Sequence, residues 1–310
     1  MENYSNRLNE LVDNMEKVMI GKREAVELGL ICLLCRGHLL IEDVPGVGKT
    51  SFANALAKSV DGTFRRIQFT PDIMPSDITG FSVYNMATGT MDYKEGAIMS
   101  HFILADEINR TSPKTQSSLL EAMEERQVTV DGNTYTLPQP FMVLATQNPV
   151  EYLGTFPLPE AQLDRFFMRI SIGYPTLREE ALILERFKGE SPLNMLPAVI
   201  NCNEVSDIQK AVENIFVNEK ITEYIVSVVD QTRRHRYVEL GASPRGSLNL
   251  YKAAQAWALY NGRDFVTPDD VVKMASHVLA HRMVMRQEAQ MRKVTSVNVI
   301  EEAIEGIRVG

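Results

Sequence analysis

The sequence of 310 residues predicts an α/β fold: a mostly parallel sheet with helices on both faces, followed by a small all-α domain. Three observations predict this fold class. Short apolar segments alternate with helix-period segments in the first half, a glycine-rich turn joins one of them to a helix, and residues after 203 show only helical periodicity. A chain of this length has room for about two domains.

Five short apolar segments are the candidate strands. Each is hydrophobic without alternation, as parallel strands are when both of their faces are buried. They are also too short to be typical helices. The candidate strands are 38–42, 64–69, 102–105, 141–145 and 167–172.

Helix-period segments lie between these strands. In 50–60, Phe52, Leu56 and Val60 recur every four residues, and 117–125 carries a comparable apolar face. Such a face is what a helix needs to pack on a sheet.

Two insertions interrupt the alternation and are predicted to be hairpins. Residues 128–130 and 134–137 alternate around Asp131-Gly132, a pair that favours a tight turn. A weaker pattern covers 83–93. We expect both hairpins to project from the core, where insertions often contact partners.

The helical domain is separated from the core by a proline-rich stretch that contains one helix near 177–188. Beyond it, Gly262 is a helix stop, and Thr267 followed by Pro268 is a helix start. We therefore place a nucleotide-binding core at 1–174, a linker at 175–203 and a helical lid at 204–310.

Composition excludes several classes of protein. The net charge of −8 disfavours attraction to nucleic acid or anionic membranes. The longest early apolar run, 28–35, falls short of the ~18 residues that span a bilayer, and the N-terminus has no secretion signal, so we expect a cytoplasmic protein without a membrane span. Cys32 and Cys35 have a metal-site spacing, but with Cys202 as the sole other cysteine we interpret them as buried helix residues.

The strongest motif is a phosphate-binding loop between the first predicted strand and its helix. Backbone N–H groups of such a loop surround phosphates, the lysine contacts their oxygens, and the hydroxyl after it binds Mg²⁺. Asp43 departs from the usual pattern, which has glycine at that position, so it must reach its backbone geometry without glycine's freedom. The predicted binding residues are Val44, Pro45, Gly46, Val47, Gly48, Lys49, Thr50 and Ser51, with Thr50 as a metal ligand.

Polar residues follow two other predicted strands. Asp106 and Glu107 end one of them, and we predict that Asp106 holds Mg²⁺ while Glu107 acts as general base toward water. Asn148, with Gln147 as the alternative, is predicted to orient that water. Arg165 and Arg245 suit phosphate oxygens, yet each could equally be a surface arginine on local sequence alone.

Taken together, these residues resemble the AAA+ ATPases, and within them the MoxR family of the helix-2-insert clade. The resemblance covers nearly the whole chain, with Asp43 as its departure. The stretches that carry it are 38–50, 105–110, 120–126, 145–149 and 158–166.

The resemblance implies roles for single residues. Gly46 to Thr50 correspond to Walker A, Asp106 and Glu107 to Walker B, and Asn148 to sensor 1. Arg165 resembles the arginine finger given to a neighbouring subunit, and Arg245 resembles sensor 2. Ile20 and Gly21 match the region that contacts the base, and the two hairpins match the helix-2 insert and the pre-sensor hairpin.

The resemblance also implies ATP and Mg²⁺ as cofactors, a homo-oligomeric ring of usually six subunits, and chaperone-like remodelling of protein clients. A partner with a von Willebrand factor A domain is implied as well. Two alternatives are a DNA-acting motor and a nucleotide-dependent switch with little turnover. The DNA alternative is disfavoured because residues 83–93 and 128–137 contain no Lys or Arg.

Overall fold

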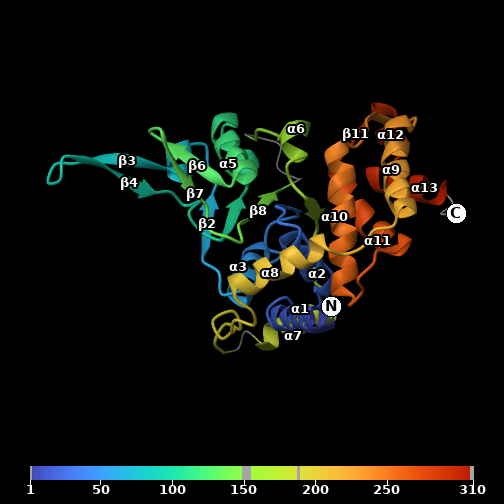
Figure 1. The fold of residues 1–310 in the computed structure, drawn as a ribbon, viewed down its shortest axis with the longest axis horizontal. Helices are drawn as coiled ribbons and strands as arrows, with labels where there is room; N and C mark the ends of the chain where they lie inside the picture. Colours follow the sequence, from blue (N-terminus) through green and yellow to red (C-terminus); the bar gives the residue numbers. More distant parts are fainter. Residues whose placement is uncertain (1, 149–154, 187–188, 308–310) are drawn as a thin grey trace.

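The computed structural model describes residues 2–148, 155–186 and 189–307. Its centre is a five-stranded sheet with the strand order β2-β5-β8-β1-β9, and all neighbouring strands are parallel (Figure 1). The α/β fold class is thereby confirmed. The strands are β1 (Leu39–Glu42), β2 (Phe64–Gln68), β5 (Phe102–Asp106), β8 (Met142–Gln147) and β9 (Met168–Ile170).

Each face of the sheet is covered by its own hydrophobic core. Leu39 and Ile41 of β1 join a cluster with the helices α1 to α3, whereas Leu40 joins a second cluster with α5 and the hairpin at 128–137. Successive side chains of a strand point to opposite faces, so one apolar strand supplies both cores. These helices are α1 (Glu2–Glu16), α2 (Arg23–Leu34), α3 (Lys49–Ser59) and α5 (Pro113–Glu125).

The expectation that every strand is buried on both faces is wrong for β2. This strand lies at the edge of the sheet, and Arg65, Arg66 and Gln68 are exposed along it. An edge strand has a neighbour on one side only, so its polar side chains remain accessible. Arg66 and Gln68 line the cavity of the candidate site.

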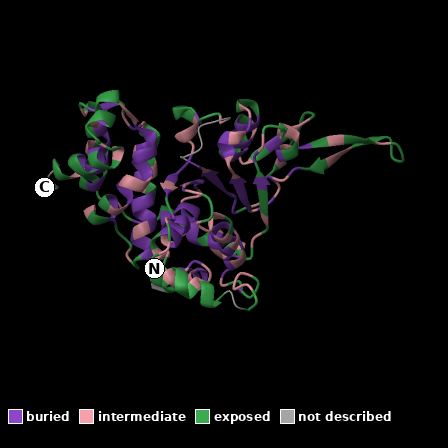
Figure 2. Ribbon diagram, turned by 180° about the vertical axis from the view of Figure 1, so that it is seen from behind, coloured by how far each residue is buried: buried purple, intermediate pink, exposed green. Residues whose placement is uncertain are grey.

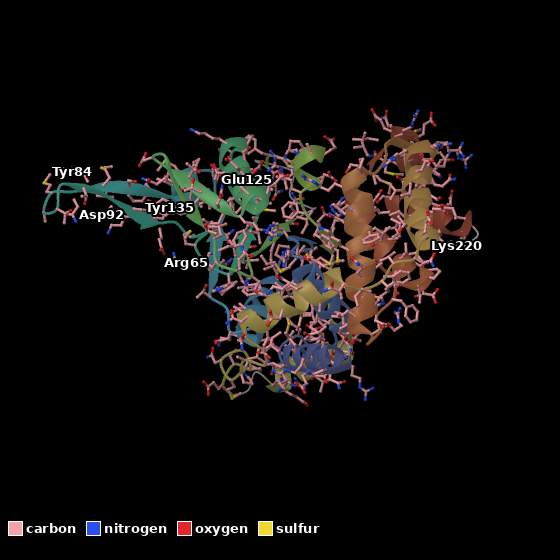
Figure 3. All side chains as sticks on the ribbon, in the orientation of Figure 1. Arg65, Tyr84, Asp92, Glu125, Tyr135 and Lys220 are labelled. Carbon is pink, nitrogen blue, oxygen red and sulfur yellow. The ribbon has the colours of Figure 1, made fainter. Side chains whose placement is uncertain are left out.

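Both predicted hairpins are present. The hairpin predicted around 83–93 projects far from the body, on the side opposite the C-terminal helices, and Figure 2 shows it as largely exposed. Tyr93 at its base stacks on Tyr135 of the second hairpin with ring centroids 4.0 Å apart, while Tyr84 lies farther out (Figure 3). The strands are β3 (Gly80–Asn85) and β4 (Thr90–Glu95), then β6 (Gln127–Val130) and β7 (Asn133–Thr136), with α4 (Pro75–Thr79) before β3.

The segment after β9 returns to the N-terminal part of the chain. Nζ of Lys22 donates a hydrogen bond to the carbonyl of Tyr174 (2.8 Å), and Arg186 donates to the carbonyl of Lys17 (2.9 Å). Helix α7 (Leu177–Arg186) lies between these two contacts and has no buried residue. It therefore lies on the surface beside the turn that precedes α2.

The C-terminal part is a helical lid, as predicted, but it is not purely helical. A small antiparallel pair, β10 (Val238–Leu240) and β11 (Val284–Met285), joins two of its loops, which corrects the expectation of helices alone. These strands are too short to show in the hydrophobic pattern. The other elements are α8 (Cys202–Glu213), α9 (Glu219–Arg234), α10 (Pro244–Tyr260), α11 (Pro268–Leu279), α12 (Gln287–Met291) and α13 (Ser296–Glu305), with short turns α6 (Glu160–Leu163), η1 (Ile108–Arg110) and η2 (Ala280–Arg282).

The lid and the core share one hydrophobic cluster. It runs from Leu8 of α1 through the sheet to Ile300 of α13. The division at 174 and 203 remains a prediction, and α8 begins at Cys202. Cys32 is buried in α2, and the described residues hold no group of three metal-ligating side chains. None of the described helices has the length and apolar character needed to cross a membrane.

We predict that Gly37→Ala lowers the stability of the fold. A Cβ on Gly37 would lie 2.3 Å from Cβ of Phe167, an atom too close to its own backbone to rotate away. The turn before β1 or the approach to β9 must then shift, at a cost of roughly 1–3 kcal/mol. Urea denaturation measures the change. Gly189→Ala is the matched control, since nothing lies within 4 Å of its added Cβ; equal stability of the two variants would contradict the prediction.

Candidate functional site

The loop between β1 and α3 has the conformation of a phosphate-binding loop. Gly46 and Gly48 have φ angles of +88° and +92°, a region that side chains other than glycine rarely adopt. Gly48 is the N-cap of α3, so Lys49 and Thr50 form the first turn of that helix. N–H groups at a helix start have no partner within the helix, and they can therefore bind an anion.

Asp43 tethers this loop to the end of β9. Its carboxylate accepts hydrogen bonds from Oγ of Ser171 (2.9 Å) and from the backbone N–H groups of Ile172 (2.5 Å) and Gly173 (3.3 Å). Asp43 is not among the described residues with a positive φ. The position therefore needs no glycine here, and the aspartate adds a contact that glycine could not make.

Lys49 extends along its own loop. Its Nζ donates a hydrogen bond to the carbonyl oxygen of Asp43 (2.6 Å), and burial lowers its pKa while the carboxylates of Asp43, Asp106 and Glu107 oppose that shift. A half-buried ammonium with three carboxylates near it is a strong electrostatic feature. It lies at the start of α3, where phosphate oxygens would be bound.

Thr146 holds the two predicted carboxylate residues in place. Its buried hydroxyl donates to Oδ1 of Asp106 (2.7 Å) and accepts from the backbone N–H of Glu107 (2.8 Å). Glu107 needs this support because its φ of +57° is left-handed, a conformation that costs energy in a residue with a side chain.

Two side chains of the edge strand β2 contact the carboxylates of Asp106 and Glu107. Arg66 forms an ion pair with Oδ2 of Asp106 (2.5 Å), and Nε2 of Gln68 donates to Oε2 of Glu107 (2.9 Å). Arg110 is 3.4 Å from the same Glu107 oxygen. Arg66, Gln68 and Thr146 were not predicted from the sequence. Arg66 and Gln68 stand two residues apart on β2 and so share one face of the strand, and this spacing is the signal that could have found them.

These groups line one cavity of about 380 Å³. Parallel strands bring their carboxyl ends to the same edge, so the loop after β1, the acidic pair after β5 and Asn148 after β8 converge there. Asn148 is buried, and Gln147 is not among the lining residues. The cavity is lined by Pro45, Gly46, Gly48, Lys49, Thr50, Arg66, Gln68, Asp106, Glu107 and Asn148.

The other predicted binding residues lie around this cavity. Val47 packs against the hydrophobic core, while Val44 and Ser51 are partly buried. Ile20 and Gly21 precede α2; the cavity's lining does not include them, but Cε of the adjacent Met19 lies 3.7 Å from where a Cβ on Gly48 would be. The segment is therefore beside the loop.

Arg165 and Arg245 lie together, away from that cavity. Both form ion pairs with Glu124 of α5, Arg165 through one carboxylate oxygen (2.9 Å) and Arg245 through the other (2.5 Å). They line a separate pocket of about 310 Å³, with Arg36, Arg126 and Lys252 among its other walls. Five cations thus face one carboxylate in this pocket. The structure brings the two predicted arginines to each other and not to Lys49.

The donor set of the first cavity fits a nucleotide phosphate with Mg²⁺. Mg²⁺ is usually held by one or two carboxylates with substrate phosphates and water, rather than by an all-protein cage. Thr50 and Asp106 supply a hydroxyl and a carboxylate there. A carboxylate has about four acceptor positions, so Asp106 can contact Thr146 through Oδ1 and Arg66 through Oδ2 and still keep a position for a hydrated cation.

Two family models match this chain. The family model described as "ATPase family associated with various cellular activities (AAA)" matches residues 38–168, and a model described as an AAA lid domain matches residues 230–303. The chain is 51% identical to YeaC of Bacillus subtilis over 302 residues, covering 97% of this chain and 94% of YeaC. It is 40% identical to chaperone MoxR1 of Mycobacterium tuberculosis over 309 residues, covering 97% of this chain and 81% of MoxR1. This chain belongs to the MoxR family of AAA+ ATPases.

A solved structure supports the same fold for this MoxR-family chain. The crystal structure of a protein from Cytophaga hutchinsonii, assigned as an ATPase, matches with a TM-score of 0.92 at 39% identity. The match covers 99% of this chain and 96% of the other. The core and lid of the MoxR-family chain are therefore arranged as in that protein.

We predict that Asp43→Ala destabilises this MoxR-family protein. The variant leaves the N–H groups of Ile172 and Gly173 without their carboxylate acceptor, and hydrogen bonds to a charged group contribute about 1.5–3 kcal/mol. Denaturant unfolding should report a loss of that size. Ser171→Ala removes one of the contacts and should cost less; unchanged stability of Asp43→Ala would show that the tether is unimportant.

Proposed function

We propose that this protein binds ATP with Mg²⁺ and hydrolyses the ATP as a ring-forming AAA+ ATPase, with arginines of one subunit completing the site of the next. The observation that carries the proposal is that Arg165 and Arg245 line one pocket while Lys49 and Glu107 line another. Phosphoryl transfer needs cationic groups on the transferred phosphoryl group. A second copy of this chain is the source of arginines that fits.

In this proposal the loop binds the substrate. Its backbone N–H groups and Lys49 bind the phosphate oxygens, and Thr50 and Asp106 hold Mg²⁺, which neutralises phosphate charge when bound. Ile20 and Gly21, beside the loop, contact the base. Lys49 has then to exchange its present acceptor, the carbonyl of Asp43, for a phosphate oxygen.

The proposed chemistry of the site is the activation of one water molecule. Glu107 accepts a proton from that water, and Asn148 fixes its position by hydrogen bonding. Gln68 donates a hydrogen bond to Oε2 of Glu107, and Nε of Arg110 lies 3.4 Å from the same oxygen, so two donors already orient the base.

The arginines are suited to a neighbour's site because they are accessible. The side chains of Arg165 and Arg245 are 33% and 41% exposed, so both guanidinium groups can be approached from outside the chain. In this proposal both Arg165 and Arg245 act in trans, although the sequence alone does not say whether Arg245 acts in cis or in trans. We propose a hexameric ring on the strength of the family resemblance.

We further propose that turnover remodels protein clients, with a von Willebrand factor A domain protein as partner. Support comes from the relative named chaperone MoxR1 and from the hairpin β3–β4. Near its tip Met86 is 91% exposed, Tyr84 58% and Met91 59%. Exposed apolar side chains of this kind are typical of protein-binding surfaces.

Two variants should separate nucleotide binding from hydrolysis. Lys49→Ala removes the charge that binds phosphate, so we expect ATP affinity to fall at least about tenfold, the effect of one lost charge-assisted contact. Glu107→Gln keeps the size of the side chain but removes the base, so it should bind ATP and lose turnover. Calorimetry and phosphate release measure the two properties. Equal losses of affinity in both variants would contradict the division of roles.

Mixing variants tests the sharing of arginines. Arg165→Ala and Arg245→Ala should each bind ATP and lose turnover, by about 10³-fold for a finger that contacts the transferred group. Adding inactive Lys49→Ala protein should restore part of the activity, because some interfaces then join an intact loop to intact arginines. Arg234→Ala, an exposed arginine paired only with Asp230 in the salt bridges of the described chain, is the control and should match wild type. No rescue in mixtures that form rings would overturn the trans assignment.

A further inference from the structure

Arg282 of the lid forms hydrogen bonds with the backbone on both sides of Arg165. Its guanidinium donates hydrogen bonds to the carbonyl oxygens of Asp164 (3.2 Å) and Phe166 (2.6 Å), and more weakly to that of Phe167 (3.4 Å). The side chain of Arg282 is fully buried. An arginine has five N–H donors in a fixed plane, so one buried guanidinium can fix a short stretch of backbone.

Asp164 connects this arginine to the start of α10. Its carboxylate forms an ion pair with Nε of Arg282 (3.0 Å) and accepts hydrogen bonds from Oγ of Ser243 at 3.0 and 3.1 Å. Ser243 precedes Arg245 by two residues. The residue next to Arg165 is thereby bonded to the residue two positions before Arg245.

We propose that Asp164, Ser243 and Arg282 form a latch between core and lid that positions Arg165 and Arg245 as one unit for the neighbouring site. The three are positioning residues, because they act through the two arginines. The inference rests on the proposed function, in which these arginines are supplied in trans. It assigns the lid a part in hydrolysis by the next subunit.

The free-energy cost of burying the charge of Arg282 supports a role beyond packing. A buried charge is expensive unless it is paired, and burial lowers the pKa of Arg282 to about 10, still far enough above neutrality for it to stay charged. The neighbouring His281 also contacts the carbonyl of Phe166 (3.1 Å), and burial lowers its pKa, so it remains neutral. A neutral imidazole adds no second charge beside the guanidinium.

Ser243 offers a mild way to open the latch. It is the N-cap of α10, yet its side chain makes no capping hydrogen bond. In the part of the chain that the structure describes, the hydroxyl contacts Asp164, and Ser243→Ala removes that contact. The variant should fold normally. Asp164→Asn is the second variant, and it keeps the shape of the side chain while removing the charge. Arg282→Ala is avoided because it leaves Asp164 and several carbonyl groups without their donor.

The expected result is a loss of turnover without a loss of binding. The kcat of Ser243→Ala and of Asp164→Asn should fall by roughly ten- to hundredfold, the effect of misplacing a group by about 1 Å, while ATP affinity and KM stay within about twofold of wild type. Lys49→Ala protein should rescue both variants in mixtures. The double variant with Asp164→Asn and Arg165→Ala should have nearly the same kcat as Arg165→Ala alone, because both changes disable the same group. Ser227→Ala, whose hydroxyl contacts the carbonyl of Glu223 on the exposed face of α9, is the matched control.

The outcomes distinguish the latch from the proposed function. Wild-type kcat in both variants, with Arg165→Ala inactive and rescued by mixing, would overturn the latch and leave the proposed function intact. A kcat loss that follows a lower Tm and is not rescued by Lys49→Ala would also overturn it, because that is the behaviour of a merely structural contact. A fully active Arg165→Ala would instead overturn the proposed function.

Discussion

The parallel register of β5, β8 and β1 is the constraint on which the candidate site depends. Leu39 pairs with Leu144, and Leu104 pairs with the same Leu144, so the three strands end almost level. Their following residues then meet at one edge: the loop after β1, the acidic pair after β5 and Asn148 after β8. A slip by one residue would turn the side chains of a strand to the opposite face and would separate Thr146 from Asp106. The apolar residues that fill the two cores hold this register, so packing far from the site determines its chemistry.

The parts of the site that could be predicted are those that follow strands directly in the sequence. The loop around Gly46, the pair Asp106 and Glu107, and Asn148 each stand next to a recognisable apolar segment, and local pattern was enough to place them. Arg66 and Gln68 were not found in this way, because they lie within a segment interpreted as a strand buried on both faces, and the exposure of β2 depends on the strand order. The strand order is set by long-range pairing, which no single segment records. The same limit explains why β10 and β11, only three and two residues long, were expected to be helical or loop.

The other features that the sequence did not predict are contacts between residues distant in sequence. Asp43 departs from the usual loop pattern, and its carboxylate accepts hydrogen bonds from residues near 172, more than 120 positions away. Asp164 finds its partners in Ser243 and Arg282, on two different elements of the lid. Periodicity and motif spacing describe a neighbourhood of about one turn or one strand. They can therefore identify the groups that react, but not the groups that hold them in place.

The two separate pockets are the electrostatic reason why the proposed function requires a second subunit. In the isolated chain Glu124 balances Arg165 and Arg245 at once, with one carboxylate oxygen to each. Phosphate oxygens can replace that carboxylate, because both are anions that match the planar guanidinium. Such a replacement needs a phosphate brought to the arginines from outside, since the loop of the same chain opens into the other cavity. Assembly would supply it, and the pocket's surplus of positive charge would favour the approach of that phosphate. Under the proposed function, hydrolysis would be a property of the interface between subunits, and the proposed latch would make the lid part of that interface.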